Sequence, residues 1–351
     1  MHKTTVVVNA ASFTSGIGRY ADSLYEALRP NSSLLNLRMD RRINFDHGET
    51  INGVFPPITN GWSFNITFYD SIYNKRIKKT ATDSVIHYSS IIGKPIKNSI
   101  ATIHDLMFLK YDDNYPRLYK RWLNKNIKYY KRLENIVTVS DYVKKQLVNN
   151  GFEGNITRIY PSVSDKISYI EDKKNIREQL NLPADKTLIL VVASSEKRKN
   201  LKILRELDLS DNFHLVNVGD SINGSLGFKS VDEEKLNLLY NACDVLLSPS
   251  LDEGFGYPVL EAMKAGLPVV ASDIEIYNET TMGRAILVDI SDVKNIKAGI
   301  RDALSNRETL SINGRNFVTK YSFQEFRKNL LEFYENEFPL EKSRNWSVLS
   351  A

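Results

Sequence analysis

The sequence contains a single cysteine, Cys243, in 351 residues. One cysteine excludes an internal disulfide framework and any multi-cysteine metal site. No apolar run approaches the ~20 residues that a membrane-spanning helix needs, and residues 1–9 lead into a strand-like run without a signal-peptide cleavage pattern. We therefore expect a cytoplasmic chain in which Cys243, beside the apolar run 244–247, is an unreactive small hydrophobic residue.

The sequence also lacks a large excess of charge of one sign. Its 47 basic and 42 acidic residues give a net charge of +5, and no nucleic-acid-binding motif is present. We expect no nucleic-acid partner. A charge of this size can steer an anionic donor molecule or anionic lipid headgroups toward the protein only weakly.

Length and pattern indicate two domains. The chain is too long for one typical core, and its hydrophobic fraction of 42% is ordinary for a globular protein. Short apolar runs alternate with helical patterns in both halves. This predicts an α/β protein with two doubly wound, Rossmann-like domains facing each other across a cleft at the carboxyl ends of their strands. We place the domain junction in the charged segment 164–179, with residues 1–165 and 166–322 as the two domains.

The most informative stretch is 244–266, whose pattern predicts a strand, a turn and a short helix. Its apolar run, 244–247, has the length of a buried strand. Pro258 stands where the helix should begin, and Gly266 where a left-handed residue should end it. The turn therefore lies at the amino end of a helix, where amide groups without an internal partner can bind a ligand.

Two glycines and two acids mark this turn. Gly254 and Gly256 have no Cβ, so a ligand can approach the backbone closely. Glu253 lies in the turn, and Glu261, one turn into the helix, can face the same space. Such a pair of acids can accept hydrogen bonds from sugar hydroxyls and balance the charge of an oxocarbenium-like transition state. Alternatively, both acids are simply exposed to solvent.

Two other strand–helix junctions carry groups that suit a phosphate. Gly16 and Gly18 follow the first strand and form either a phosphate cradle or an ordinary tight turn. The third glycine of the dinucleotide fingerprint is missing. Arg198 and Lys199 follow the strand predicted at 187–193. Arginine can grip two oxygens of a diphosphate while lysine adds a point charge, although an exposed charged loop is the other interpretation.

A basic run lies between residues 115 and 133. The basic residues of 117–132 alternate with apolar residues at roughly helical spacing, which predicts a helix with one basic and one apolar face. Such a helix can lie on an anionic membrane surface. It can equally cover the sheet with its apolar face while its basic face is solvated. The sequence leaves open whether the protein makes a peripheral contact with the inner membrane face.

The stretch Asp252–Met263, together with Ala265–Asp273, resembles the glutamate-x7-glutamate signature of glycosyltransferase family 4. The members of this family are retaining, nucleotide-sugar-dependent glycosyltransferases with the GT-B fold. The resemblance spans almost the whole chain and is densest from Thr187 to Asp289. It departs from the family at Ser162-Val163, where asparagine-glycine is common after the proline. It also implies that the C-terminal helix, about 323–351, packs back onto the first domain.

The resemblance implies a role for each matching residue. His104 would contact the transferred sugar, and Asp105 would lie toward the acceptor. The residues expected to bind the donor are Gly16 and Gly18 (diphosphate), Gly219 and Phe228 (base), Gly254, Phe255 and Gly256 (sugar hydroxyls), Glu261 (ribose) and Tyr257.

Residues and resemblance together predict retaining transfer of a hexose from a nucleoside-diphosphate sugar to a saccharide or lipid-linked saccharide. Glu253 and His104 would act on the sugar, while Arg198 and Lys199 would neutralise the departing diphosphate. We expect no cofactor and no metal, with GDP-mannose or UDP-glucose as the donor. Glu253 and Lys199 should lie outside the core, so alanine at either position should cut turnover with little loss of stability.

Three alternatives belong to other classes of protein. A GT-B phosphorylase would need a lysine-bound pyridoxal phosphate or a free phosphate site. A non-catalytic sugar-nucleotide sensor would bind the donor without turnover, but the presence of both glutamates and the Arg198-Lys199 pair argues against it. The incomplete glycine pattern disfavours a dinucleotide-dependent oxidoreductase.

Overall fold

The protein is represented by a computed structural model that describes residues 3–8, 16–36, 77–79, 84–111, 117–207, 212–222 and 224–339. The chain divides into two compact units. Unit 1 comprises Met1–Ser162 and Phe323–Ala351, and unit 2 comprises Val163–Ser322. Unit 2 thus begins at Val163, three residues before residue 166, where the sequence predicted the second domain to begin.

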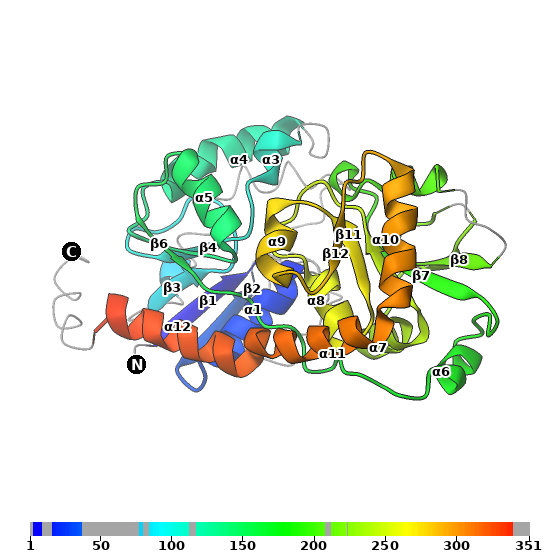
Figure 1. Ribbon diagram of the computed structural model, residues 1–351. Helices are drawn as coiled ribbons and strands as arrows, with labels where there is room; N and C mark the ends of the chain where they lie inside the picture. The colour runs from blue at the N-terminus through cyan, green and yellow to red at the C-terminus, as the bar shows by residue number, and fades with distance from the viewer. Residues whose placement is uncertain are drawn as a thin grey trace, which may run out of the picture. The chain divides into compact units, whose positions relative to one another are not determined.

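Unit 1 is built on a parallel sheet of six strands in the order β2-β1-β3-β4-β5-β6 (Figure 1). The strands are β1 (Thr4–Val8), β2 (Ser32–Asn36), β3 (Val85–Tyr88), β4 (Ile100–Ile103), β5 (Asn135–Thr138) and β6 (Asn155–Arg158). All residues of β1 and β4 are buried, as expected where helices cover both faces of a parallel sheet. The winding direction reverses between β1 and β3, and ligands of such sheets bind at this switch point.

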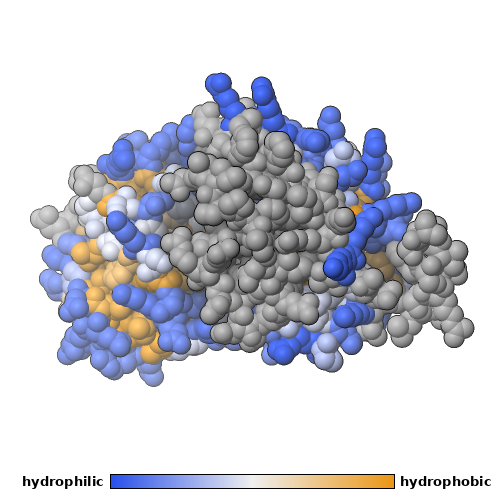
Figure 2. All heavy atoms as spheres, turned by 180° about the vertical axis from the view of Figure 1, so that it is seen from behind, coloured by the Kyte–Doolittle hydropathy of each residue, from blue (hydrophilic) through white to orange (hydrophobic). Residues whose placement is uncertain are grey.

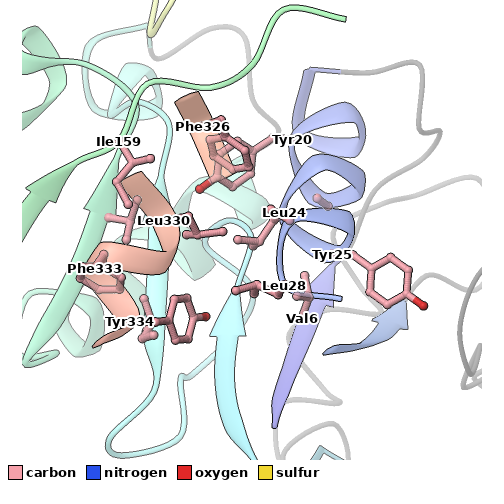
Figure 3. Close-up of a cluster of buried hydrophobic side chains, with 14 of the residues drawn as sticks. Val6, Tyr20, Leu24, Tyr25, Leu28, Ile159, Phe326, Leu330, Phe333 and Tyr334 are labelled. Atoms are coloured by element: carbon pink, nitrogen blue, oxygen red, sulfur yellow. The ribbon is translucent and has the colours of Figure 1, made fainter. Parts of the chain in front are cut away.

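The helices of unit 1 come from both ends of the chain. They are α1 (Gly16–Ala27), α3 (Met107–Lys110), α4 (Arg117–Tyr130), α5 (Asp141–Asn149) and α12 (Phe323–Glu337). Helix α12 lies beside α1 (Figure 1). Tyr20 and Leu24 of α1 share a buried cluster with Phe326 and Leu330 of α12 (Figure 3). Residues 340–351 of the predicted C-terminal helix lie outside the described residues.

Unit 2 contains a second parallel sheet of six strands, in the order β12-β11-β10-β7-β8-β9. The strands are β7 (Thr187–Ala193), β8 (Phe213–Gly219), β9 (Leu226–Phe228), β10 (Val245–Ser248), β11 (Val269–Ser272) and β12 (Ile286–Val288). Numbered within the unit, this is the Rossmann order 3-2-1-4-5-6 read from the opposite edge. Its switch point lies between β7 and β10.

The helices of unit 2 are α6 (Lys173–Gln179), α7 (Glu233–Ala242), α8 (Tyr257–Lys264), α9 (Glu275–Thr281), α10 (Val293–Ser305) and α11 (Arg307–Val318). The sequence analysis missed α6 and α11. After β7 the structure has 3₁₀ turns at Lys197–Lys199 and Leu201–Arg205. Asn200 between them is left-handed, with φ of 53°, so a continuous α-helix is interrupted there.

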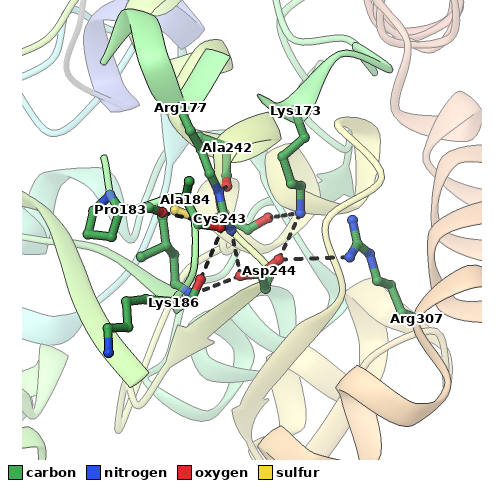
Figure 4. A network of polar contacts seen from close by, with 10 residues as sticks. Lys173, Arg177, Pro183, Ala184, Lys186, Ala242, Cys243, Asp244 and Arg307 are labelled. Carbon is green, nitrogen blue, oxygen red and sulfur yellow. Dashed lines mark hydrogen bonds and ion pairs between the residues drawn. The ribbon is translucent and has the colours of Figure 1, made fainter. Parts of the chain in front are cut away.

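A buried polar network holds the amino-terminal end of β10 (Figure 4). Asp244 accepts hydrogen bonds from Arg177 at 2.6 Å, from Lys173 at 3.0 Å and from the Leu188 amide at 2.8 Å. Because Leu188 belongs to β7, the network locks β7 against β10 at the end of the sheet opposite the strand carboxyl ends. Cys243 beside it is buried, and burial raises the pKa of its thiol to about 12.

The amphipathic helix predicted between residues 115 and 133 is α4. Its residues Trp122, Leu123 and Ile127 are buried, while Arg121, Lys125 and Lys128 are exposed. Within the described part of the chain, no helix is long and apolar enough to span a bilayer. The face seen in Figure 2 carries many hydrophilic residues, with hydrophobic residues in patches among them.

Candidate active site

The loops that follow β7 and β10 meet at the switch point of unit 2. Arg198 lies in the loop after β7, and Leu251 follows β10. The Leu251 amide donates a hydrogen bond to the Arg198 carbonyl at 2.6 Å, which ties the two loops together. Strand β10 also pairs directly with β7. The topology therefore brings side chains separated by more than fifty positions in the sequence to one edge of the sheet.

Three of the predicted site residues are in direct contact at this edge. Lys199 Nζ lies 2.5 Å from Glu253 Oε1, and Arg198 Nη1 lies 3.0 Å from Glu253 Oε2. Arg198 also donates from Nε to Glu196 Oε2 at 2.7 Å. Two cations thus face two carboxylates, so the charges of this group balance in the free protein.

The cluster is more deeply buried than the sequence suggested. Glu253 is 7% exposed and Lys199 is 9% exposed. The expectation that both lie outside the core was therefore wrong, because each is desolvated and depends on the other for compensation. Burial alone would raise the pKa of Glu253. The charges of Lys199 and Arg198, with a hydrogen bond from Ser250, outweigh burial and hold that pKa below its ordinary value.

The carboxylate of Glu253 accepts three hydrogen bonds, from Lys199, Arg198 and Ser250. A carboxylate offers about four lone-pair sites, so Glu253 has room for one more donor, such as a sugar hydroxyl. A diphosphate at this edge would compete with Glu253 for the N–H groups of both cations. The arrangement can therefore hold a negative group and a polyol side by side.

The predicted turn before α8 is present. Gly256 is left-handed, with φ of 86°, and α8 begins at Tyr257 with Pro258 in its first turn. The ring of Phe255 is 4% exposed and meets that of Tyr257 edge-on at a centroid distance of 5.2 Å. Phe255 therefore faces the protein interior, and only the backbone around it can serve a sugar directly.

Glu261 lies in a separate environment within α8. Its side chain is 1% exposed, and its carboxylate accepts a hydrogen bond from the Tyr240 hydroxyl at 2.9 Å. Tyr240 belongs to α7, so this bond joins the two helices that follow β9 and β10. The contact of Glu261 with a ribose stays a prediction. To make it, the carboxylate would have to reach the ribose from this buried position beside Tyr240.

The two residues expected near the base lie on β8 and β9. Gly219 ends β8 with φ of 118°, and a Cβ there would come within 2.1 Å of the Ala193 carbonyl oxygen. Only glycine fits, because β7 and β8 approach each other closely at this point. Phe228 ends β9 and is half-buried, with Lys235 Nζ 5.1 Å from its ring centroid.

The other predicted residues belong to unit 1. Gly16 begins α1, the helix that follows β1 in the chain, and Gly18 is buried in its first turn. His104 follows β4, and its Nε2 lies 2.8 Å from the Ser89 carbonyl oxygen after β3. Asp105 accepts a hydrogen bond at 3.0 Å from the amide of Met107, the first residue of α3. The four residues thus follow strands on either side of the switch point of unit 1.

His104 is a neutral imidazole with a defined tautomer. Desolvation lowers its pKa to about 4. A carbonyl oxygen can only accept a hydrogen bond, so Nε2 carries the proton and Nδ1 presents a lone pair. The Tyr20 ring meets the imidazole edge-on at 4.8 Å. At neutral pH, His104 can therefore accept a hydrogen bond from a hydroxyl but brings no charge to a phosphate.

Sequence reasoning missed two side chains that touch the charged cluster. Ser250 donates to Glu253 Oε1 at 2.9 Å and is 2% exposed, and Glu196 pairs with Arg198. Both lie within three residues of a predicted site residue, but small polar and acidic residues are common in loops and gave no specific signal. Among the described residues, no group of three or more His, Cys, Asp or Glu side chains could hold a metal ion.

Two family models match the chain, one in each half. Residues 14–166 match Glycosyltransferase Family 4, and residues 223–320 match Glycosyl transferases group 1. The second match includes the turn with Glu253 and all of α8. The chain is also similar to the O-antigen chain mannosyltransferase RfbU of Salmonella typhimurium, with 27% identity over 66% of this chain and 68% of that protein.

Solved structures show the same fold. A sucrose-phosphate synthase from Thermosynechococcus elongatus superposes with a TM-score of 0.81 at 20% identity, covering 96% of this chain and 99% of that one. Anabaena Alr3699/HepE in complex with UDP-glucose superposes with a TM-score of 0.71 at 13% identity, covering 96% and 100% of the two chains. The two six-stranded parallel sheets are those of the GT-B fold.

Proposed function

We propose a specific reaction for this chain, which belongs to the GT-B glycosyltransferases with a family 4 domain and a group 1 domain. In this reaction the protein transfers a hexose from a nucleoside-diphosphate sugar to a saccharide or lipid-linked saccharide, with retention of the anomeric configuration and without a metal. Mannose is the favoured sugar, because a similar protein is described as an O-antigen chain mannosyltransferase. An O-antigen-type saccharide is the corresponding acceptor.

One observation carries this proposal. A buried glutamate, Glu253, is held between Arg198 and Lys199 at the switch point of the unit 2 sheet. A sugar diphosphate has a polyol on one side of the breaking bond and a diphosphate on the other. The cluster has an acceptor for hydroxyls directly beside two cations for phosphate oxygens.

The proposed step divides the work between these groups. As the bond between the anomeric carbon and the diphosphate oxygen breaks, its electron pair goes to the diphosphate. Arg198 and Lys199 shift their hydrogen bonds from Glu253 to that oxygen. Glu253, released from its cations, balances the positive charge that develops on the sugar. The acceptor hydroxyl forms the new bond on the same face, and its proton passes to the diphosphate.

His104 would contribute from unit 1. With Nε2–H committed to the Ser89 carbonyl, Nδ1 accepts a hydrogen bond from a sugar hydroxyl. This orients the sugar without adding charge. The diphosphate would also contact the amides at the start of α1, near Gly16 and Gly18, where a helix terminus favours an anion.

The test is release of free nucleotide from UDP-, GDP-, ADP- and TDP-sugars, measured without added metal, with EDTA and with added divalent metal. Wild type should hydrolyse one donor slowly, and Glu253→Gln should lose that activity. Glu308→Gln, at an exposed position of α11, is the matched control and should behave as wild type. A metal requirement would refute the metal-independent step. Silence with every donor, together with no shift in melting temperature, would refute the transferase reaction itself.

A lipid-linked acceptor would bring the protein to a membrane, and we propose that α4 makes this contact. Residues 117–133 hold seven basic residues and no acidic one, whereas the rest of the chain has 40 basic and 42 acidic residues. Arg121, Lys125 and Lys128 are exposed at helical spacing along one face of α4, and Arg132 just beyond its end is exposed as well. Tyr129 beside them is 36% exposed. A basic face with an aromatic residue suits anionic lipid headgroups.

Binding to vesicles with and without phosphatidylglycerol tests this contact. Each basic residue near an anionic surface contributes roughly 1 kcal/mol, so Lys125→Glu with Lys128→Glu should weaken binding by about 30-fold or more. The same exchange at Lys294 and Lys297 of α10 is the charge-matched control. Equal binding by both double variants would refute the assignment to α4.

A further inference from the structure

Tyr277, in α9, is buried directly behind the turn that carries Glu253. It is 1% exposed, and its hydroxyl lies 2.7 Å from Ser248 Oγ at the end of β10. We propose that Tyr277 is a positioning residue of the transfer reaction, which, together with Ser250, fixes the Glu253 carboxylate and the backbone turn that ends at Gly256. This inference rests on the reaction proposed above.

The ring of Tyr277 shapes the end of the turn. A Cβ at Gly256 would lie 2.7 Å from Cε1 of Tyr277. The turn therefore packs against the ring without space for a side chain, and its left-handed residue is in contact with the aromatic edge. Because interiors are close-packed, the position of the ring limits where the backbone between Glu253 and Gly256 can lie.

The hydroxyl of Tyr277 acts on the other end of the turn. Hydrogen bonding with Ser248 and Ser250 affects this phenol, and Ser250 in turn donates to Glu253 Oε1 at 2.9 Å. Burial, followed by the negative charge of Glu253, raises the pKa of Tyr277 far above its ordinary value. The phenol is therefore protonated at any working pH and can donate to a serine oxygen. Tyr277, Ser248, Ser250 and Glu253 thus form one polar group, in which the Tyr277 hydroxyl lies 2.7 Å from Ser248 Oγ and Ser250 donates to the Glu253 carboxylate.

This polar group has a function in the proposed step. When Arg198 and Lys199 move from Glu253 to the diphosphate, Glu253 loses two of its three hydrogen-bond donors. Ser250 is the donor that remains. The Glu253 carboxylate, held by Ser250 with the support of Tyr277, would keep its place while the cations shift. A misplacement of about 1 Å in an active site can cost on the order of 100-fold in rate.

The test is a double-mutant cycle of Tyr277→Phe and Ser250→Ala, measured on the donor that wild type hydrolyses. Each single variant should lower kcat by about 10-fold or more, while affinity for UDP or GDP alone changes less than about twofold. The acid limb of kcat/KM should move to higher pH in both, since the Glu253 carboxylate loses support. If both residues act through this one polar group, the double variant should fall no further than Ser250→Ala.

Tyr130→Phe is the control for removal of a buried phenol. Its hydroxyl accepts from the Ile92 amide at 2.7 Å in unit 1, so this variant should lose stability and keep kcat. Multiplying effects in the double variant, or Tyr277→Phe with lowered stability and unchanged kcat and pH profile, would overturn the inference and leave the proposed function intact. A wild type that turns over no donor would remove both.

Discussion

Replacing Glu253 by glutamine should destabilise unit 2, contrary to what its position in a loop suggests. Glutamine keeps the size of the side chain and removes its charge. Lys199, whose side chain is 11% exposed, would then lose the carboxylate that it bonds, while Arg198, 15% exposed, would keep only its pair with Glu196 among the two carboxylates of the cluster. Breaking a buried ion pair by removing one partner costs about 3 kcal/mol or more. Lys199→Met should cost less, because Arg198 still pairs with Glu253.

The melting temperature measures this loss. Unit 2 spans 163–322, and for a domain of that size 1 kcal/mol corresponds to about 2–4 °C. Glu253→Gln should therefore lower the melting temperature of unit 2 by about 6–12 °C. A spectroscopic probe within this unit should report the transition, because the two units need not melt together. A shift below about 2 °C would refute the argument that the cluster is desolvated.

The pH dependence gives a second, independent check on the same variant. The pKa of Glu253 is held below its ordinary value in the folded protein. Its stabilisation is thus complete above the unfolded value of about 4.3 and is lost as the pH falls through the folded pKa. The stability difference between wild type and Glu253→Gln should be constant from pH 8 to 5 and shrink at lower pH. A difference that grows on acidification would contradict the assigned charge.

Two further substitutions test the scaffold around the site. Arg177→Met removes the donors to the Ala242, Ala184 and Lys186 carbonyls and to Asp244. A denaturant titration should show unit 2 destabilised by about 3 kcal/mol, while the folded variant keeps wild-type affinity for the donor. Gly219→Ala should lower the free energy of unfolding by about 3 kcal/mol and weaken nucleotide binding measured by calorimetry. At Gly224, where φ is 78° and nothing lies within 4 Å of an added Cβ, alanine should cost only about 1 kcal/mol.

Local signals made the strand–turn–helix of the site predictable. Gly266 is left-handed with φ of 73°, as its place after the helical pattern suggested. Ser140, a residue type that favours helix starts, caps α5 by accepting a hydrogen bond from the Val143 amide at 3.1 Å. In both places one residue satisfies a terminus within a few positions along the chain, so the sequence carries all the information that is needed.

Elements with weaker local signals were missed. Strand β2, Ser32–Asn36, is short and half polar, and it is recognised only through its parallel pairing with β1. Helix α6 was interpreted as part of a charged junction, although Asp172 caps it by accepting from the Asn175 amide at 3.1 Å. That capping pattern was available in the sequence. Helix α11 follows α10 after Asn306 alone, too short a break for a loop signal.

The contact between Arg198 or Lys199 and Glu253 could not be derived from spacing. It depends on β7 and β10 being neighbours, although β8 and β9 separate them in the chain. Tyr277 is a further step away, since it reaches the turn from the helix after β11. What the residues did indicate was a common location at strand carboxyl ends, and the parallel topology turns that common edge into contact.

Acid should destabilise unit 1 through two histidines. His87 is fully buried, with Nδ1 2.8 Å from the Tyr334 hydroxyl and Nε2 2.8 Å from Thr102 Oγ1. Desolvation lowers its pKa to about 3, and that of His104 to about 4. An unfolded histidine takes up its proton near pH 6.5, so the unfolded state binds more protons throughout the range between these values.

Stability contributed by the neutral histidines is therefore present above pH 6.5 and lost as the pH falls toward the folded pKa values. Between pH 7.5 and pH 5, each histidine should lower the free energy of unfolding of unit 1 by about 2 kcal/mol. Denaturant unfolding, monitored by a probe in unit 1, measures this loss of stability at each pH. His87→Gln should remove about half of the pH dependence, even if the variant is less stable than wild type at every pH. A unit 1 stability that stays constant between pH 7.5 and 5 would mean that neither imidazole is held neutral, and the proposed Nδ1 acceptor of His104 would lose its basis.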